Sequence, residues 1–173
     1  MSLPRRLAII DVESTGAHPV RYRITEIAIL RIEDGEVVAR WESLVAPGQA
    51  IPPLIEQVTG ISDAMVADAP PFEAVADTVA ALLEGCVFVA HSARFDFGFI
   101  KNAFTRIGRE FAAPVLCTVK LSRALFPEHH RHGLDALIER HGLVCAARHR
   151  AMGDVEVLWQ FVRQVEAAFA PEV

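Results

Sequence analysis

The sequence has few cysteines, no long hydrophobic run and no export signal, and each absence excludes a class of protein. Its three cysteines, an odd number without a C-x-x-C pair, disfavour a disulfide scaffold, a redox pair and a structural zinc site. We expect Cys86, Cys117 and Cys145 to be buried free thiols in a reducing cytoplasm. No uncharged apolar run approaches the roughly 18 to 20 residues of a membrane helix. The apolar stretch 7–10 is shorter than the apolar core of a secretory signal, about 7 to 15 residues, so we expect a cytoplasmic protein without a membrane partner.

The composition that remains indicates a folded domain. Hydrophobic residues make up 52% of the 173 residues and charged residues 23%, which is typical of a globular protein with a sizeable core. No repeat, linker or low-complexity segment divides the chain. We therefore expect a single domain over residues 1–173.

Acidic residues outnumber basic ones, which disfavours a nucleic-acid partner at first sight. The formal net charge is −5, whereas nucleic-acid binding depends on Lys and Arg that neutralise phosphates. The charges are unevenly distributed, however: residues 24–90 hold eleven acids and two bases, and residues 91–150 hold ten bases and five acids. Of the 17 basic residues 15 are Arg, which suits bidentate phosphate contacts. Charge alone leaves nucleic-acid binding and an ordinary solvated surface equally open.

The pattern of apolar residues and turns predicts an α/β fold with a mixed central sheet flanked by helices. An N-terminal antiparallel meander is expected over 7–13, 24–32 and 37–45, with Asp34-Gly35 as a hairpin turn. Strands then alternate with helices, which is typical of parallel pairing. The later elements are expected as strands over 86–90 and 115–117 and helices over 54–58, 63–67, 71–83, 94–107, 118–125, 134–141 and 152–169.

Two carboxylates lie at the end of the first expected strand. Asp11 and Glu13 are two residues apart, so their side chains point to the same face of the sheet. Their apolar neighbours indicate a central strand, where an unpaired charge is costly. A bound cation would offset the repulsion between them; acids that reach solvent at a strand end are the alternative.

Two more acids and a histidine are candidates for the same site. Asp96 lies in an otherwise apolar helix opening, where a favourable interaction with the helix dipole is the alternative role. Asp154 lies on the apolar stripe that includes Leu158 and Phe161, so it points toward the sheet. His149 is expected on the loop before this helix, free to move over the site. The four carboxylates would converge at one sheet edge, and all-oxygen ligands suit hard cations such as Mg²⁺ or Mn²⁺.

Three ordered motifs span nearly the whole chain: IDVESTG at 10–16, HSARFD at 91–96 and HRAMGD at 149–154. With the intervening segments ITEIA, VTGI and HGLDAL, they resemble the DnaQ-like (DEDDh) family of 3′-to-5′ exonucleases, including the epsilon type of bacterial DNA polymerase III proofreading subunit. That family has a ribonuclease H-like fold. Two positions depart from its usual pattern, with Ser14 where Thr is frequent and Ser92 where Asn is frequent.

The resemblance implies roles for the acids and the histidine. Asp11, Glu13 and Asp154 would hold one metal ion. Asp11 would also hold a second ion, which Asp96 would support through water. His149 would be the general base that takes a proton from the attacking water.

The resemblance also implies contacts with the terminal nucleotide. The backbone around Ser14 and Thr15 would touch that nucleotide. Val58, Thr59 and Phe95 would pack near its base or sugar, although apolar residues at these positions serve equally well as core.

From these observations we expect a two-metal 3′-to-5′ exonuclease. It would release nucleoside 5′-monophosphates from single-stranded DNA in proofreading or repair, with Mg²⁺ or Mn²⁺ and a DNA polymerase catalytic subunit as a candidate partner. Two alternatives stay open: an RNA-trimming 3′-to-5′ exoribonuclease of the same family, and a non-catalytic nucleic-acid-binding or polymerase-docking module.

Overall fold

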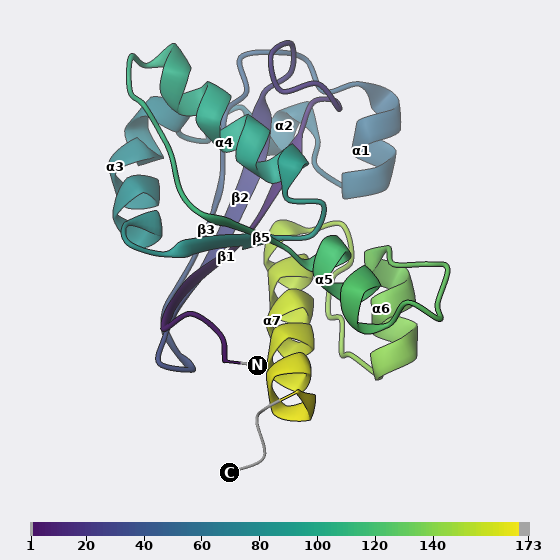
Figure 1. Ribbon diagram of the computed structural model, residues 1–173. Coiled ribbons are helices and arrows are strands. Elements are labelled where there is room, and N and C mark those ends of the chain that lie inside the picture. The colour runs from purple at the N-terminus through teal and green to yellow at the C-terminus, as the bar shows by residue number, and fades with distance from the viewer. Residues whose placement is uncertain (1, 170–173) are drawn as a thin grey trace.

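The computed structural model describes residues 2–169 as a mixed five-stranded sheet with helices on both faces (Figure 1). The strand order is β3-β2-β1-β4-β5. The first three strands pair antiparallel, and β4 and β5 continue the sheet in parallel with β1. The predicted α/β class and the N-terminal meander are therefore confirmed.

The observed elements agree with the expected ones to within about two residues at each end. The strands are β1 Arg6–Ser14, β2 Ile24–Glu33, β3 Glu36–Leu44, β4 Val87–Ala90 and β5 Val115–Cys117. The helices are α1 Pro53–Thr59, α2 Asp63–Val66, α3 Phe72–Leu83, α4 Arg94–Arg106, α5 Thr118–Leu125, α6 Leu134–His141 and α7 Ala151–Ala168.

The predicted hairpin turn has the backbone that its residues favour. Asp34 and Gly35 have φ angles of 49° and 83° and join the paired residues Glu33 and Glu36. Two successive positive φ angles define a turn whose twist matches that of the flanking strands, and Asp-Gly is one of the few pairs that adopt it at low cost. The turn sets the register of β2 against β3.

Strand β1 lies at the centre of the sheet, and its alternating side chains enter two separate cores. Ala8, Ile10 and Val12 pack with α3 and α4, whereas Leu7 and Ile9 pack with α7. Figure 1 shows α7 along one face of the sheet and α3 and α4 on the other. The α7 face is the one that continues into the acidic end of β1.

Two observations bear on the cysteine and membrane expectations. All three cysteines are free, but only Cys86 is buried; Cys117 and Cys145 are partly exposed, which corrects the prediction of three buried thiols. Cys117 lies at the end of β5 and Cys145 in the loop between α6 and α7, where packing is incomplete on one side. Across residues 2–169 no helix combines the length and the apolar character needed to cross a membrane.

Candidate metal and active site

Three carboxylates from two elements meet beside the end of β1. One carboxylate oxygen from each of Asp11, Glu13 and Asp154 lies within 4.8 Å of the other two. Asp11 and Glu13 share one face of β1, as predicted, and Asp154 reaches the same place from the first turn of α7. Oxygens gathered this closely provide the ligand set that a hard divalent cation takes.

Two oxygens in this group are buried without any hydrogen bond. Among the residues that the structure describes, neither Asp11 Oδ2 nor Asp154 Oδ1 has a donor within reach. A buried acceptor without a donor costs about 1 to 3 kcal/mol, and more when it is charged. A bound cation would satisfy both atoms, so the residues fit the divalent ion that the acidic motif implies.

Asp96 approaches the same strand from α4. Its side chain is 2% exposed, and its Oδ1 accepts a hydrogen bond of 3.0 Å from the Val12 backbone N–H. That amide is available because β4 pairs with β1 only over residues 7–9 and ends before it reaches Val12. Asp96 lies outside the group of three mutually close oxygens, but its charge raises the pKa of Asp11.

Burial raises the pKa of all four acids, and repulsion by neighbouring acids adds to it. Burial is the main cause for each, and it raises the pKa of Glu13 and that of Asp96 to about 8. The pKa of Asp11 is raised well above its ordinary value by burial and by Asp96, Glu13 and Asp154. The pKa of Asp154 is raised less, because the Arg148 guanidinium opposes the effect of burial. When all four groups are ionised, they form a strong anionic centre.

The raised pKa values predict that the metal-free protein loses stability as pH rises. The folded state holds carboxyl protons that the unfolded chain releases near pH 4, so their stabilising contribution is complete below about pH 4 and is lost as pH rises through about 8. Thermal unfolding in EDTA should therefore show a falling midpoint between about pH 5.5 and about pH 8.5. Mn²⁺, which binds the ionised acids, should raise the midpoint more at the higher pH.

The control for this experiment is Asp68→Asn, which removes an exposed acid. It should leave the slope of the unfolding midpoint against pH unchanged. Replacing Asp11 by Asn should flatten that slope. A metal-free protein whose stability rises over the same interval would contradict the assignment of raised pKa values.

His149 lies on the loop immediately before α7, as predicted. Its φ angle is 62°, in the left-handed region that few residues other than glycine adopt. The following turn is tightly packed: a Cβ added at Gly153 would lie 2.1 Å from the Ala147 carbonyl oxygen. Only glycine lets the loop approach α7 this closely, so the chain holds the imidazole beside the first turn that carries Asp154.

Glu26 fixes the start of α7 and was not singled out from the sequence. This residue of β2 is 3% exposed and pairs across the sheet with Glu13. Its Oε1 accepts the Ala151 N–H at 2.7 Å, and its Oε2 accepts from Arg150 Nη2 at 2.6 Å. An acid beside the apolar run 27–30 of this strand was the available signal, but its partner Ala151 is 125 positions away in the sequence.

Replacing Glu26 by Ala should destabilise the protein by about 2 kcal/mol, because it leaves a buried N–H and a guanidinium without their acceptor. Urea denaturation measures this change. The matched control is Glu156→Ala, which breaks the exposed pair of 2.5 Å with Arg40 and should cost less than about 1 kcal/mol. Equal losses in the two variants would show that Glu26 does not hold α7.

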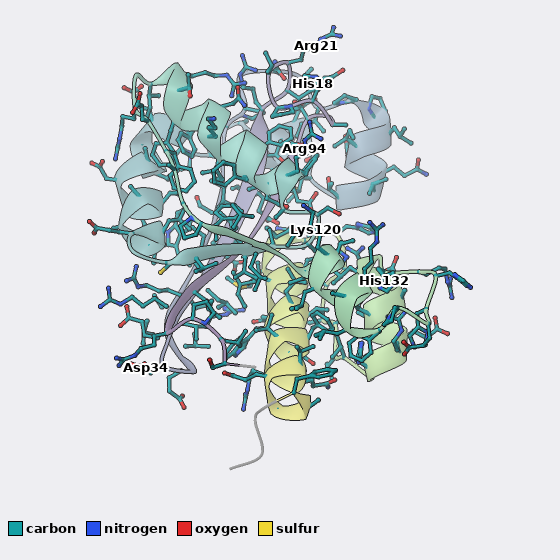
Figure 2. All side chains as sticks on the ribbon, viewed as in Figure 1. His18, Arg21, Asp34, Arg94, Lys120 and His132 are labelled. Carbon is teal, nitrogen blue, oxygen red and sulfur yellow. The ribbon has the colours of Figure 1, made fainter. Side chains whose placement is uncertain are left out.

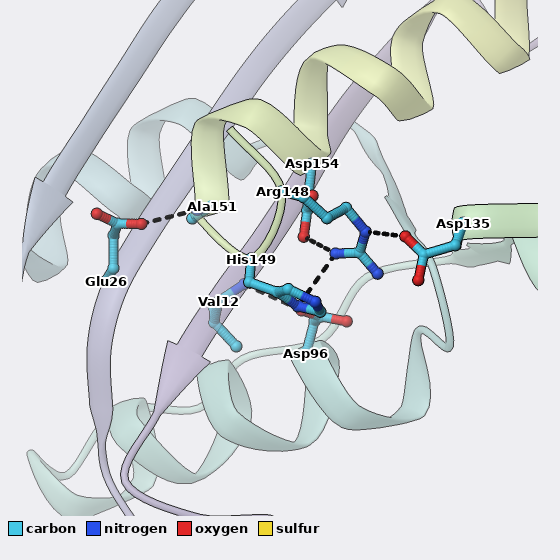
Figure 3. A network of polar contacts seen from close by, with 8 residues as sticks. All are labelled: Val12, Glu26, Asp96, Asp135, Arg148, His149, Ala151 and Asp154. Atoms are coloured by element: carbon cyan, nitrogen blue, oxygen red, sulfur yellow. Dashed lines mark hydrogen bonds and ion pairs between the residues drawn. The ribbon is translucent and has the colours of Figure 1, made fainter. Parts of the chain in front are cut away.

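Arg148 is a second functional candidate that the sequence interpretation missed. Its Nη1 donates to Asp154 Oδ2 at 2.6 Å, and its Nε donates to Asp135 Oδ1 at 2.7 Å. The same Nη1 lies 3.3 Å from His149 Nδ1. Figure 3 shows the guanidinium between the two aspartates. A base directly before the motif histidine was the available signal.

The residues expected near the substrate end are placed in different ways. Ser14 Oγ donates to the Gly16 carbonyl at 2.6 Å. Thr15 Oγ1 donates to Gln49 and accepts from the Arg23 N–H, and the Thr15 amide donates to the Arg23 carbonyl. These bonds hold the β1–β2 loop, so both hydroxyls already have partners.

The other three belong to helices α1 and α4. Val58 is 50% exposed on α1. Thr59 is buried, and its hydroxyl bonds the Ile55 carbonyl and the Ile61 N–H at the end of that helix. The Phe95 ring is partly buried against Phe99, with ring centroids 4.8 Å apart. Of the three, only Val58 is largely open to solvent.

The sheet order, the helices on both faces and the acids at the end of β1 define the class: an α/β domain of the ribonuclease H-like type. Comparison with known sequences then identifies the family. The family model described as Exonuclease (RNase_T) matches residues 8–161, so the chain belongs to the exonuclease family.

Curated relatives are longer proteins that contain a matching region. The chain is 43% identical over 155 residues to the 3′-5′ exonuclease DinG of Bacillus subtilis (strain 168), covering 88% of this chain and 17% of that protein. It is 42% identical over 151 residues to a DNA polymerase III subunit epsilon-like protein of Rhodobacter capsulatus, covering 84% of this chain and 21% of that protein. The chain thus spans about a fifth or less of the curated relatives that it matches.

Solved structures agree with the family. Exonuclease X, in complex with 5′ overhanging duplex DNA, shares 28% identity and a TM-score of 0.78, over 96% of this chain and 94% of that one. The zinc-bound complex of E. coli exonuclease I with single-stranded DNA shares 20% identity and a TM-score of 0.86, over 98% of this chain and 42% of that one. The second likeness concerns the fold alone. The chain therefore belongs to the exonuclease family and is related to a 3′-5′ exonuclease and to a DNA polymerase III epsilon-like protein.

Proposed function

We propose that this chain is a divalent-metal-dependent 3′-to-5′ exonuclease that removes nucleoside 5′-monophosphates from single-stranded DNA. The observation that carries the proposal is the group formed by Asp11, Glu13 and Asp154, with two buried oxygens that lack a donor in the described part of the chain. A domain that only bound nucleic acid would gain stability by losing these mutually repelling acids.

The closeness of Asp11, Glu13 and Asp154 supports the ligand set that the family resemblance implies. Asp11, Glu13 and Asp154 would hold one Mg²⁺ or Mn²⁺, and Asp11 would share a second ion that Asp96 supports through water. When bound, the two ions would acidify the attacking water and stabilise the leaving 3′ oxygen. Asp96 has a further task of its own, because its bond to the Val12 N–H holds the end of β1 against α4.

His149 is the proposed general base. Imidazole accepts a proton readily near neutral pH, and the loop holds the ring beside the first turn of α7. The packing of Gly153 against Ala147 and the capping of α7 by Glu26 both limit how far this loop can shift. The imidazole would take the proton of the water that attacks the terminal phosphodiester.

Exposed bases provide a route for the substrate backbone. Arg94 at the start of α4 and Lys120 on α5 are both exposed (Figure 2), and neither has an acidic partner among residues 2–169. Since α4 also carries Asp96, these cations would attract phosphates toward the acidic centre. This supports nucleic acid as the substrate class despite the net charge of −5.

The end of the strand would meet the β1–β2 loop and α1. Ser14 and Thr15 would offer backbone groups, and Val58, Thr59 and Phe95 would pack near the terminal base or sugar. The Thr15 amide already donates to the Arg23 carbonyl. The Thr15 carbonyl is therefore the backbone group left to contact the nucleotide. The exposed Val58 is the strongest apolar candidate of the three.

Relatives with polymerase names support a role in DNA proofreading or repair. Several are DNA polymerase III proteins of PolC type or epsilon-like. We accordingly propose a DNA polymerase catalytic subunit as a partner in the cytoplasm, with residues 1–173 acting as one exonuclease domain.

A matched pair of oligonucleotides tests the proposal. The purified protein should shorten a 5′-labelled single-stranded DNA from its 3′ end with Mg²⁺ or Mn²⁺, and EDTA should stop the reaction. The RNA oligomer of the same sequence should react more slowly. Faster cleavage of RNA would establish the exoribonuclease alternative, and cleavage of neither strand with any divalent ion would establish a non-catalytic module.

A further inference from the structure

Arg148 joins a carboxylate of the proposed metal site to one outside it. Its two bonds, 2.6 Å to Asp154 and 2.7 Å to Asp135, link the first turn of α7 to the first turn of α6. The three side chains differ in exposure: Asp154 is 6% exposed, Arg148 28% and Asp135 76%. The guanidinium therefore spans from the buried acidic centre to the protein surface.

The two oxygens of Asp154 have different surroundings. Oδ2 accepts from Arg148 Nη1, whereas Oδ1 is buried without a donor in the described structure. A divalent ion at Oδ1 would lie close to a guanidinium on the other oxygen of the same carboxylate. Two cations so close in a half-buried setting repel strongly, so they compete for Asp154.

Asp135 offers the guanidinium a second acceptor that no divalent ion needs. It lies outside the group of three close carboxylates and accepts from a different nitrogen, Arg148 Nε. Arg carries five N–H donors in a rigid fork, so it can release one acceptor while it keeps another. The Arg148 side chain can then leave Asp154 and still keep Asp135 as a partner.

We propose that Arg148 is a positioning residue that neutralises Asp154 until a divalent cation binds there, and that Asp135 anchors the displaced guanidinium. This inference rests on the proposed function, because it needs a cation site at Asp11, Glu13 and Asp154. Arg148 would reduce the repulsion among the acids in the metal-free protein, and Asp135 would make the exchange for metal favourable.

A purely mechanical role for the same contacts predicts something different. If Arg148 only braced the loop before α7 against α6, removing either partner would disturb the site in the same way. Both changes would then weaken metal binding. Competition with an anchor predicts opposite signs instead, because losing Arg148 removes the competitor and losing Asp135 leaves the competitor on Asp154.

The experiment is a Mn²⁺ titration by calorimetry without nucleic acid. Arg148→Gln should bind Mn²⁺ about tenfold more tightly than the wild type, and Asp135→Asn should bind it about threefold more weakly. In the Arg148→Gln background, Asp135→Asn should have no further effect, since Asp135 acts through Arg148. Arg148→Met, which keeps the aliphatic stem, has the same expected result and replaces Arg148→Gln if that variant does not fold.

The control is a pair of the same chemistry elsewhere. Arg109, in the segment that follows α4, is joined at 2.7 Å to Asp77 of α3, so Arg109→Gln and Asp77→Asn should leave the Mn²⁺ affinity unchanged. Weaker binding in both Arg148→Gln and Asp135→Asn would overturn the inference in favour of a brace. An undiminished Asp135→Asn effect in the double variant would also overturn it, because Asp135 would then act by its own charge. A wild type that binds no Mn²⁺ would overturn the proposed function as well, which separates the two failures.

Discussion

Replacing Asp11 by Asn should lower the rate of DNA hydrolysis by at least about a thousandfold, because each metal ligand supports several kcal/mol of transition-state stabilisation. The same change should stabilise the metal-free protein at high pH. Asp11 is where burial and three neighbouring acids all oppose ionisation, and a neutral amide of equal size removes that conflict. Opposite effects on activity and stability distinguish a metal ligand from a structural acid.

Two measurements check this prediction on one preparation. Single-turnover hydrolysis with Mg²⁺ gives the loss of rate, and thermal unfolding in EDTA at about pH 8.5 gives the gain in stability. Asp154→Asn should lose activity to a similar extent, since its Oδ1 is the other buried oxygen without a donor. Asp68→Asn, which changes an exposed acid, should alter neither quantity. An Asp11→Asn enzyme that keeps the wild-type rate would refute the metal site.

Replacing His149 by Asn should lower the hydrolysis rate by about 10² to 10⁴-fold, the usual contribution of a general base. Asn is chosen because it tolerates the positive φ of 62° at this position better than Ala does. The loop should therefore keep its path, and only the imidazole is lost. Mn²⁺ affinity should stay within about twofold of the wild type, because His149 is not a proposed ligand.

The two readouts separate proton transfer from metal binding. A His149→Asn enzyme that loses rate and keeps its Mn²⁺ affinity supports the general-base role. Loss of both would show that the residue organises the metal site instead. The matched control is His130→Ala, an exposed histidine on the segment between α5 and α6, which should change neither rate nor affinity.

Local sequence was enough to predict most of the fold. The apolar runs in β1 and β2, the Asp34-Gly35 turn and the helical stripe of α7 each report the surroundings of residues a few positions apart. Such patterns persist in the folded protein because each face is buried against a core. Burial was harder to predict at strand ends and in loops, and Cys117 and Cys145, which lie there, are less buried than expected.

The acids of the candidate site could be predicted from the sequence, but the charged residues that support them could not. Asp11 and Glu13 stood out because charges in a central strand are costly, and Asp154 because it lay on an apolar stripe. Arg148 and Glu26 did not stand out, because Arg148 lies in a basic segment of the sequence and Glu26 in an acidic one. Their roles depend on contacts with distant or exposed partners that no local pattern reports.

The sequence by itself therefore determined which residues form the strands and helices and which acids are out of place, because hydrophobic periodicity and the cost of burying charge act on neighbouring residues. Only the tertiary structure decided which charged residues surround those acids. Strand register places Glu26 opposite Glu13, and the packing of α7 brings Arg148 to Asp154 and Asp135. Electrostatic interactions depend on distance in space, and chain folding sets that distance independently of separation along the sequence.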